Sequence, residues 1–269
     1  MPNHRRSRKK RSNLQPLLLA IGFLFLLGTG ALLLIRWWHG RGSYIERPAI
    51  IRYKNFGIHI PPGFAVHGID VSNHQGSINW PLVGAMRDDG ISLDFVIIKA
   101  TEGVSHTDRK FERNWRGAQK AGMTRGAYHF FTPSISGKEQ ARHFISQVKL
   151  RPGDLPPVLD VETIGFVSKE RLKSRVREFL ETVEKHYKIK PIIYSNAKFY
   201  DHVLGPEFNN YPLWVAHYFR LNSPRIGRNW TFWQHSERGR VNGIRGSVDF
   251  NVFEGDALAL RKLLVRPPR

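Results

Sequence analysis

Cysteine is absent from this 269-residue sequence, so neither a disulfide nor a thiolate can contribute to its stability or its chemistry. Gly-rich phosphate-binding loops are also missing, which argues against a nucleotide cofactor. Neither an HxxxH nor a CxxC spacing supports a metal site, and no nucleic-acid-binding motif is visible. We therefore expect no cofactor, no metal and no nucleic-acid partner, and a fold that is stabilised by its apolar core.

The first 13 residues lack acids and carry six Lys and Arg side chains, and an uncharged, largely apolar run follows from residue 14 to residue 35. That run is long enough to cross roughly 30 Å of hydrocarbon as a helix. Arg36, Trp37 and Trp38 then resemble an interfacial anchor, without a small-x-small cleavage site. A cleaved signal peptide is the alternative, and we predict an uncleaved signal-anchor.

This interpretation divides the chain into four parts. The chain would cross the inner (cytoplasmic) membrane once, with its N-terminus in the cytoplasm and the rest of the chain in the periplasm or outside the cell. The parts are a basic tail (1–13), a transmembrane segment (14–38), a linker (39–64) and one large folded domain (65–269).

The formal net charge is +20, of which the N-terminal cluster supplies only six units. Outside a membrane, a basic domain meets anionic cell-wall polymer and phospholipid headgroups first. Solubility and nonspecific adhesion explain the basic surface equally well.

Eight short apolar runs recur after residue 64, several of them separated by helical patterns. The clearest helical stripe runs from Leu172 to Tyr187, with Ser168 as its expected N-cap. Alternating strands and helices predict an α/β fold with a mainly parallel sheet, and eight strands suggest a modified TIM-like (β/α) barrel with weaker helical cover on the last strands. The runs are AVHGID (65–70), FVIIKA (95–100), RGAYHFF (125–131), PPVLDV (156–161), PIIYS (191–195), LWVAHY (213–218), TFWQH (231–235) and SVDFN (247–251).

Asp160 and Glu162 are the most informative pair, because they lie two residues apart at the end of a strand-like run and should point to the same face. Neighbouring acids repel when both are ionised, so such a pair can hold a proton donor beside a carboxylate, as glycosidases require. Polar residues also follow the other runs, and in a barrel the carboxyl ends of the strands converge on one rim. They are Asp70, Lys99 with Glu102, Tyr128 with His129, Tyr194, His217 with Tyr218, Gln234, and Asp249 with Asn251.

Eight motifs in order resemble glycoside hydrolase family 25, the lysozyme or N-acetylmuramidase family. The resemblance covers roughly residues 66–260 and implies hydrolysis of the β-1,4 bond between N-acetylmuramic acid and N-acetylglucosamine in peptidoglycan. The motifs are HGIDVSNHQG (67–76), INW (78–80), FVIIKATEG (95–103), the run 111–131, LPPVLDVE (155–162), PIIYSN (191–196), LWVAHY (213–218) and the run 232–253.

The resemblance implies a role for each acid. Glu162 matches the general acid, which must hold a proton near neutral pH, so we expect it to be partly buried near other acids. Asp160 matches the carboxylate that either stabilises positive charge at the anomeric carbon or orients the 2-acetamido group as an internal nucleophile. Asp70 and Asp249 match two further acids of the site. The expected substrate-binding residues are Tyr128, Tyr194, Trp214, Trp233, Glu102 and Gln234.

Structural alternatives exist for several of these residues. Asp70 and Asp249 could cap helices or turns, and Glu102 could instead be the ion partner of Lys99. The tryptophans could fill the core. At the level of function, the alternatives are a peptidoglycan-binding module without turnover and a hydrolase of another polysaccharide.

Overall fold

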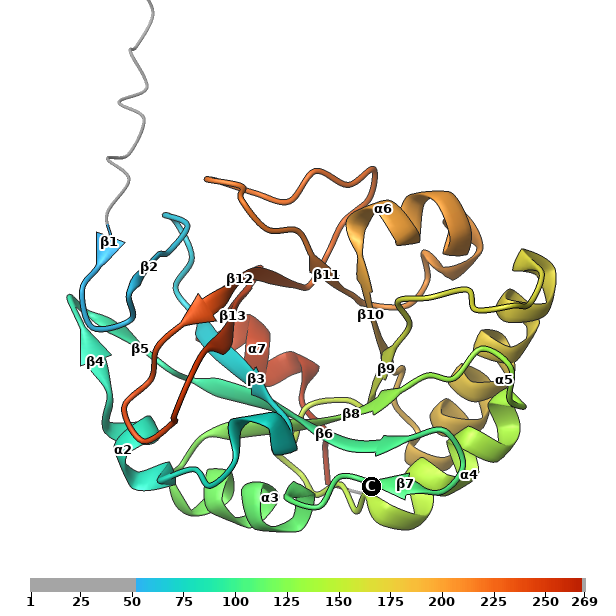
Figure 1. Cartoon of the computed structure of the whole chain (residues 1–269), viewed down its shortest axis with the longest axis horizontal. Coiled ribbons are helices and arrows are strands. Elements are labelled where there is room, and N and C mark those ends of the chain that lie inside the picture. The colour runs from blue at the N-terminus through green and yellow to red at the C-terminus, as the bar shows by residue number, and fades with distance from the viewer. Residues whose placement is uncertain (1–51, 268–269) are drawn as a thin grey trace, which may run out of the picture. The chain divides into compact units, whose positions relative to one another are not determined.

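The structure is a computed structural model that describes residues 52–267, so the predicted tail and transmembrane segment lie outside it (Figure 1). The main sheet has nine strands, of which the short β7 (His106–Thr107) only pairs with the end of β6. The other eight form the barrel: β3 (His67–Val71), β6 (Phe95–Glu102), β8 (Thr124–Phe130), β9 (Val158–Asp160), β10 (Ile192–Asn196), β11 (Leu213–Ala216), β12 (Phe232–Gly239) and β13 (Val248–Phe253). Their order is β3-β13-β12-β11-β10-β9-β8-β6, and β6 pairs again with β3. The predicted closed barrel and its eight strands are confirmed.

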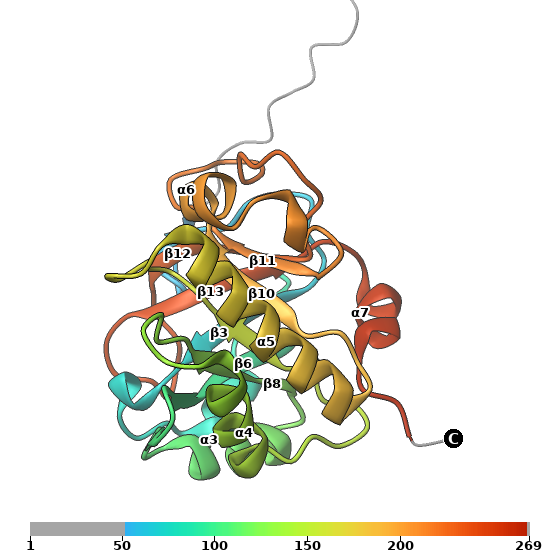
Figure 2. The ribbon, with the colours of Figure 1, turned by 90° about the vertical axis from the view of Figure 1, so that its right-hand side faces the viewer.

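Helices cover the outside of the parallel half of the barrel (Figure 2). The main ones are α3 (Phe111–Lys120), α4 (Gly137–Gln147) and α5 (Lys169–Tyr187). Ser168 caps α5 as predicted, since its side chain accepts a hydrogen bond from the backbone N–H of Arg171. Within residues 52–267 no helix is long and apolar enough to cross a membrane. The smaller elements are α2 (Trp80–Ala85), α6 (Ala197–Phe199), α7 (Ala257–Leu263), β4 (Arg87–Asp88), β5 (Ile91–Ser92), β7 (His106–Thr107), two 3₁₀ turns (Asn73–Gln75 and Pro206–Phe208) and a π-helical turn (Tyr200–Leu204).

Part of the predicted linker belongs to the folded domain. The strands β1 (Arg52–Tyr53) and β2 (Ile58–His59) form an antiparallel hairpin, whose turn uses Gly57 at a φ of 71°. Phe56 is fully buried and packs edge-on against Phe250 of β13, with ring centroids 5.2 Å apart. The last strands lack large helices on their outer face, and this hairpin covers their aromatic side chains instead.

Side chains alternate between two apolar layers along each strand. Val96 and Ile98 of β6 face the outer layer under the helices, whereas Phe95 and Ile97 face the barrel interior. Leu260 of α7 belongs to the interior layer, so this helix closes the end of the barrel opposite the strand ends that carry the acids. The polar site rests on this interior layer.

The direction of β13 corrects one prediction. Asp249 was expected at the carboxyl end of its strand, but β13 runs antiparallel to both β12 and β3, and Asp249 is its second residue. The beginning of β13 therefore lies at the rim where the other strands end. The composition of a strand does not encode its direction, so the run SVDFN could not reveal this reversal.

Candidate active site

Asp160 and Glu162 form the first carboxyl pair of the barrel mouth. Leu159 and Val161 lie in the outer layer, so Asp160 points into the barrel, as period-two alternation requires. Asp160 is 6% exposed, and its pKa is raised by burial first and by the charge of Glu162 second. Glu162 is the more accessible of the two carboxyls. The pair thus combines a buried acid, whose pKa is raised, with an accessible acid.

Asp70 and Asp249 form the second pair, directly opposite each other on β3 and β13. Burial raises the pKa of Asp70 well above its ordinary value, and the charge of Asp249 raises it further. Burial also raises the pKa of Asp249, to about 6. Both carboxyls therefore hold a proton more tightly than an ordinary aspartate does. Among the described residues neither of them accepts a hydrogen bond from a backbone N–H, so the capping role considered above is wrong for both.

Two buried amides hold Asp70 in position. Gln234 Nε2 and Asn251 Nδ2 both donate to Oδ2 of Asp70, at 2.9 and 2.8 Å. Gln234 is 2% exposed, and its Oε1 accepts the hydroxyl groups of Tyr194 at 2.8 Å and Tyr218 at 2.6 Å. Gln234, which was expected to bind substrate, therefore has partners within the protein for both atoms of its amide group. We assign it the role of a positioning residue.

The predicted tyrosines Tyr128 and Tyr194 both face the acids, but they differ in access. Burial raises the pKa of each well above its usual value, and the charge of Asp160 is the second cause for both. Both hydroxyl groups therefore stay neutral and can donate hydrogen bonds. Tyr194 is 6% exposed and its hydroxyl is engaged with Gln234, whereas Tyr128 is only partly covered. Tyr128 is thus the better placed of the two to contact a ligand.

The two predicted tryptophans are not open platforms for a sugar. Trp233 is fully buried in the outer layer, where its Nε1 donates to the carbonyl of His217 at 2.9 Å. Trp214 is 2% exposed inside the barrel, where it packs on Tyr194 and donates its Nε1 to Asn251 Oδ1 at 2.8 Å. The substrate-platform prediction is wrong for both, and core filling, the alternative considered for them, is what the structure has.

Glu102 forms an ion pair with Lys99, Nζ to Oε2 at 2.7 Å. Residues three apart on a regular strand face opposite sides, but a bulge between Lys99 and Thr101 shifts the register of β6 against β8. The extra residue between Lys99 and Thr101 brings the side chain of Glu102 to the same face of β6 as that of Lys99. The positive charge of Lys99 in turn lowers the pKa of the buried Asp160.

Three residues of the network were expected at the rim but had been given no role in the site. Asn251 donates to Asp70, Tyr218 donates to Gln234, and the charge of Lys99 acts on Asp160. Period-two counting could have assigned each of them to the inward face, because Asn251 is two residues from Asp249, Tyr218 continues the inward positions of β11, and Lys99 follows the inward Ile97.

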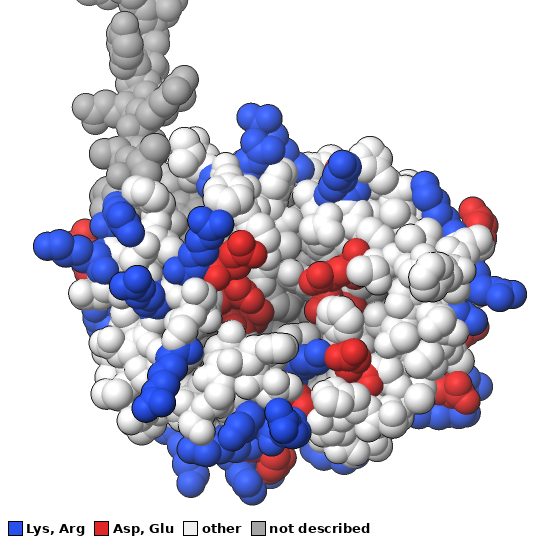
Figure 3. All heavy atoms as spheres, viewed as in Figure 1, with Lys and Arg blue, Asp and Glu red and all other residues white. Residues whose placement is uncertain are grey.

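The acids gather in a hollow on an otherwise basic molecule. In Figure 3, Asp and Glu side chains line both sides of a hollow in the face that is viewed, while Lys and Arg surround its rim. Four carboxyl groups, three of them with raised pKa values, a lysine and neutral tyrosine hydroxyls thus face one opening. Such a set can donate a proton, stabilise positive charge and hydrogen-bond a polar neutral ligand.

Comparisons with known proteins agree with this geometry. The model of the family described as "Glycosyl hydrolases family 25" matches residues 69–244. "Uncharacterized protein YegX" of Escherichia coli O157:H7 is 46% identical over 91% of this chain and 92% of its own length. "Lysozyme M1" of Streptomyces globisporus is 38% identical over 74% of this chain and 71% of its own length.

Solved structures of the same kind share the fold. A bacterial lysozyme from Streptomyces coelicolor superimposes with a TM-score of 0.65 and 36% identity, over 74% of this chain and 96% of its own. A family 25 glycosyl hydrolase from Bacillus anthracis gives a TM-score of 0.69 and 32% identity, over 76% and 95% of the two chains. The chain therefore belongs to glycosyl hydrolase family 25, and it is a glycoside hydrolase.

Proposed function

We propose that this protein is a peptidoglycan N-acetylmuramidase, which hydrolyses the β-1,4 bond between N-acetylmuramic acid and N-acetylglucosamine. The observation that carries the proposal is the joining of Asp160 with Glu162, and of Asp70 with Asp249, at one barrel mouth. The similarity to Lysozyme M1 and to the lysozyme from Streptomyces coelicolor supports the choice of substrate.

In the proposed mechanism Glu162 is the general acid. It is the accessible member of its pair, so it can reach the glycosidic oxygen, and its neighbour Asp160 is a buried acid. As the glycosidic bond breaks, positive charge develops at the anomeric carbon. Asp160, beside Lys99, either stabilises that charge or orients the 2-acetamido group. Asp249, opposite Asp70, adds negative potential above its pKa of about 6.

The test is digestion of purified peptidoglycan by the full-length chain, with mass analysis of the new reducing ends. We expect muramic acid reducing ends, and a loss of roughly 10²- to 10⁴-fold in rate for Glu162→Gln. Glu254→Gln is the matched control, since Glu254 is exposed and follows the end of β13 that points away from the mouth. Retained activity in Glu162→Gln would remove Glu162 from the general-acid role.

The same experiment separates the alternatives. A wild-type chain that binds sacculi but releases no reducing ends would be a binding module. Reducing ends that form only from another polysaccharide would keep the hydrolase and change its substrate.

We also propose that residues 14–38, which lie outside the described part of the chain, anchor the enzyme in the inner membrane. The support is the apolar run with its basic N-terminal flank. A C-terminal epitope tag should then be cleaved by protease added to intact spheroplasts, and recovery of the protein in the carbonate-soluble fraction would contradict the anchor.

A further inference from the structure

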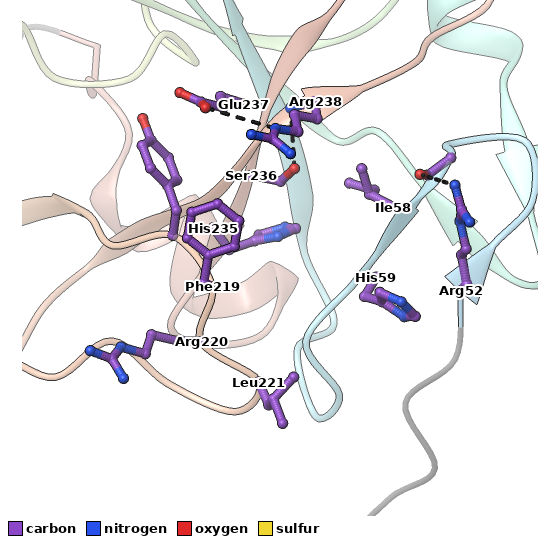
Figure 4. A pocket seen from close by; sticks show the side chains of 12 residues that line it. Arg52, Ile58, His59, Phe219, Arg220, Leu221, His235, Ser236, Glu237 and Arg238 are labelled. Carbon is purple, nitrogen blue, oxygen red and sulfur yellow. Dashed lines mark hydrogen bonds and ion pairs between the residues drawn. The ribbon is translucent and has the colours of Figure 1, made fainter.

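A second hollow lies beside the barrel mouth, between the hairpin β1–β2 and the segment that follows β11 (Figure 4). It has a volume of about 430 Å³, within the usual size of small-ligand pockets, roughly 300 to 1,000 Å³. In Figure 4, Ile58, His59 and Arg52 line one side, and Phe219 and Arg238 line the other. The hairpin wall precedes residue 69, where the family match begins.

This pocket is connected to the acids by Tyr218. The residue lines the pocket, and its hydroxyl bonds to Gln234, which in turn bonds to Asp70. Glu237, another lining residue, is close enough to Asp249 for its charge to raise the pKa of that group. A substituent of a sugar bound at the acids could therefore extend into the pocket.

Phe219 is the most unusual residue of the pocket. Its φ is 58°, in the left-handed region that costs a non-glycine residue roughly 1–2 kcal/mol. Its side chain is 81% exposed, so burial of the ring does not offset this strain. Strained residues of this kind mark functional sites when the surrounding structure holds them in place.

The charged groups of the pocket are mainly cationic. Arg238 lies over the ring of Phe219, with its guanidinium carbon 5.7 Å from the ring centroid. The contact between Arg238 and Glu237 is long, at 4.0 Å. Arg52 donates one hydrogen bond, from its Nη2 nitrogen to the carbonyl of Gly57 at 3.3 Å. Both guanidinium groups thus keep donors for a carboxylate. Arg220 also lines the pocket, but Figure 4 shows it pointing away from the other side chains.

We propose that this pocket binds the carboxylate-bearing peptide that is attached to the glycan, with Arg238 and Arg52 facing its carboxylates and Phe219 packing on its apolar part. The assignment rests on the proposed peptidoglycan substrate. A glycan strand without peptide carries only the lactyl carboxylate fixed to each N-acetylmuramic acid ring, and it offers no apolar side chain. The combination of arginines and an exposed aromatic ring therefore matches the peptide better than the sugar.

The test measures binding to the full-length chain carrying Glu162→Gln, so that turnover does not consume the ligand. The two probes are a disaccharide–tripeptide fragment of peptidoglycan and the same disaccharide without peptide. We expect the peptide-bearing probe to bind more tightly, and Arg238→Gln to weaken it about tenfold, because one charge-assisted hydrogen bond is lost. Affinity for the peptide-free probe should be the same in both chains.

Phe219→Gly is the second variant, since glycine adopts the observed φ without strain and the fold is kept while the ring is removed. It should weaken binding of the peptide-bearing probe severalfold. Arg142→Gln, an equal change of charge at an exposed position of α4, is the control and should change neither affinity.

The outcomes separate the two proposals. Equal affinity of the two probes, or an equal loss for both in Arg238→Gln, would overturn the peptide pocket while peptidoglycan cleavage by the wild-type chain still stood. Selective loss for the peptide-bearing probe, in a protein that releases no reducing ends, would keep the pocket and remove the muramidase.

Discussion

The two carboxyl pairs reach the same mouth through different halves of the barrel. Asp160 and Glu162 lie two residues apart at the end of one strand, where every neighbouring strand is parallel. Asp70 and Asp249 come from opposite ends of the sequence and meet because β13 is antiparallel to β3. In the first pair one acid is accessible, which suits proton transfer to a ligand. In the second pair the two acids face each other and Asp70 is held by two buried amides, which suits a fixed electrostatic background.

The first pair should be the more sensitive to change. We expect Asp160→Asn to lower the rate of glycan cleavage by roughly 10²- to 10³-fold, because the variant removes a preorganised carboxyl group next to the general acid. Asp256→Asn is the control, since Asp256 caps α7 and asparagine caps equally well. The rates of reducing-end release measure both, and a loss below threefold would exclude Asp160 from the chemistry.

A further variant distinguishes the two roles of Asp160. If Asp160 orients the acetamido group, Asn should retain more activity than Ala, because its amide oxygen still accepts a hydrogen bond. If it stabilises charge, Asn and Ala should be equally poor.

The second pair, Asp70 and Asp249, should make the free energy of unfolding depend on pH. Asp249 has a pKa of about 6 in the folded protein against 3.8 as its ordinary value, so the folded state binds the proton more tightly. Its contribution to stability is therefore complete below pH 3.8 and is lost as the pH rises through 6. Asp249→Asn should remove about 1 to 3 kcal/mol of this decline in the free energy of unfolding between pH 4 and pH 6.5. Denaturant unfolding at both pH values measures it, and equal declines in wild type and variant would contradict the raised pKa of Asp249.

Sequence reasoning found the acids through local rules and missed what depends on pairing. Asp160 and Glu162 follow from period-two alternation within one strand. The contact between Asp70 and Asp249 depends on the direction of β13, which only the folded sheet determines. Likewise, nothing in the local sequence around Phe56 shows that it packs against Phe250, so the hairpin was interpreted as linker.

Trp214 and Trp233 lie on the neighbouring strands β11 and β12 but belong to the inner and the outer apolar layer, so variants of both allow the two layers to be compared. Trp214→Phe and Trp233→Phe each remove one buried N–H donor and should each lower the free energy of unfolding by about 1–3 kcal/mol. Only Trp214→Phe should slow catalysis, by a few fold, because the lost bond leads through Asn251 to Asp70. Denaturant unfolding and cleavage rates of both variants test this. An equal effect of both on the rate would show that the inner network does not position the acids.

The smallest effect is expected at the rim of the first pair, where Glu102 and Lys99 meet. Glu102 is 40% exposed, and an ion pair open to water contributes at most about 1 kcal/mol. Glu102→Gln should therefore change the free energy of unfolding by less than that amount, and it leaves Lys99 beside Asp160. Lys99→Met should be the more harmful of the two, since it removes the positive charge that lowers the pKa of Asp160. Cleavage rates as a function of pH would separate them. A larger loss in Glu102→Gln than in Lys99→Met would mean that Glu102 contacts the substrate itself and that its ion pair is secondary.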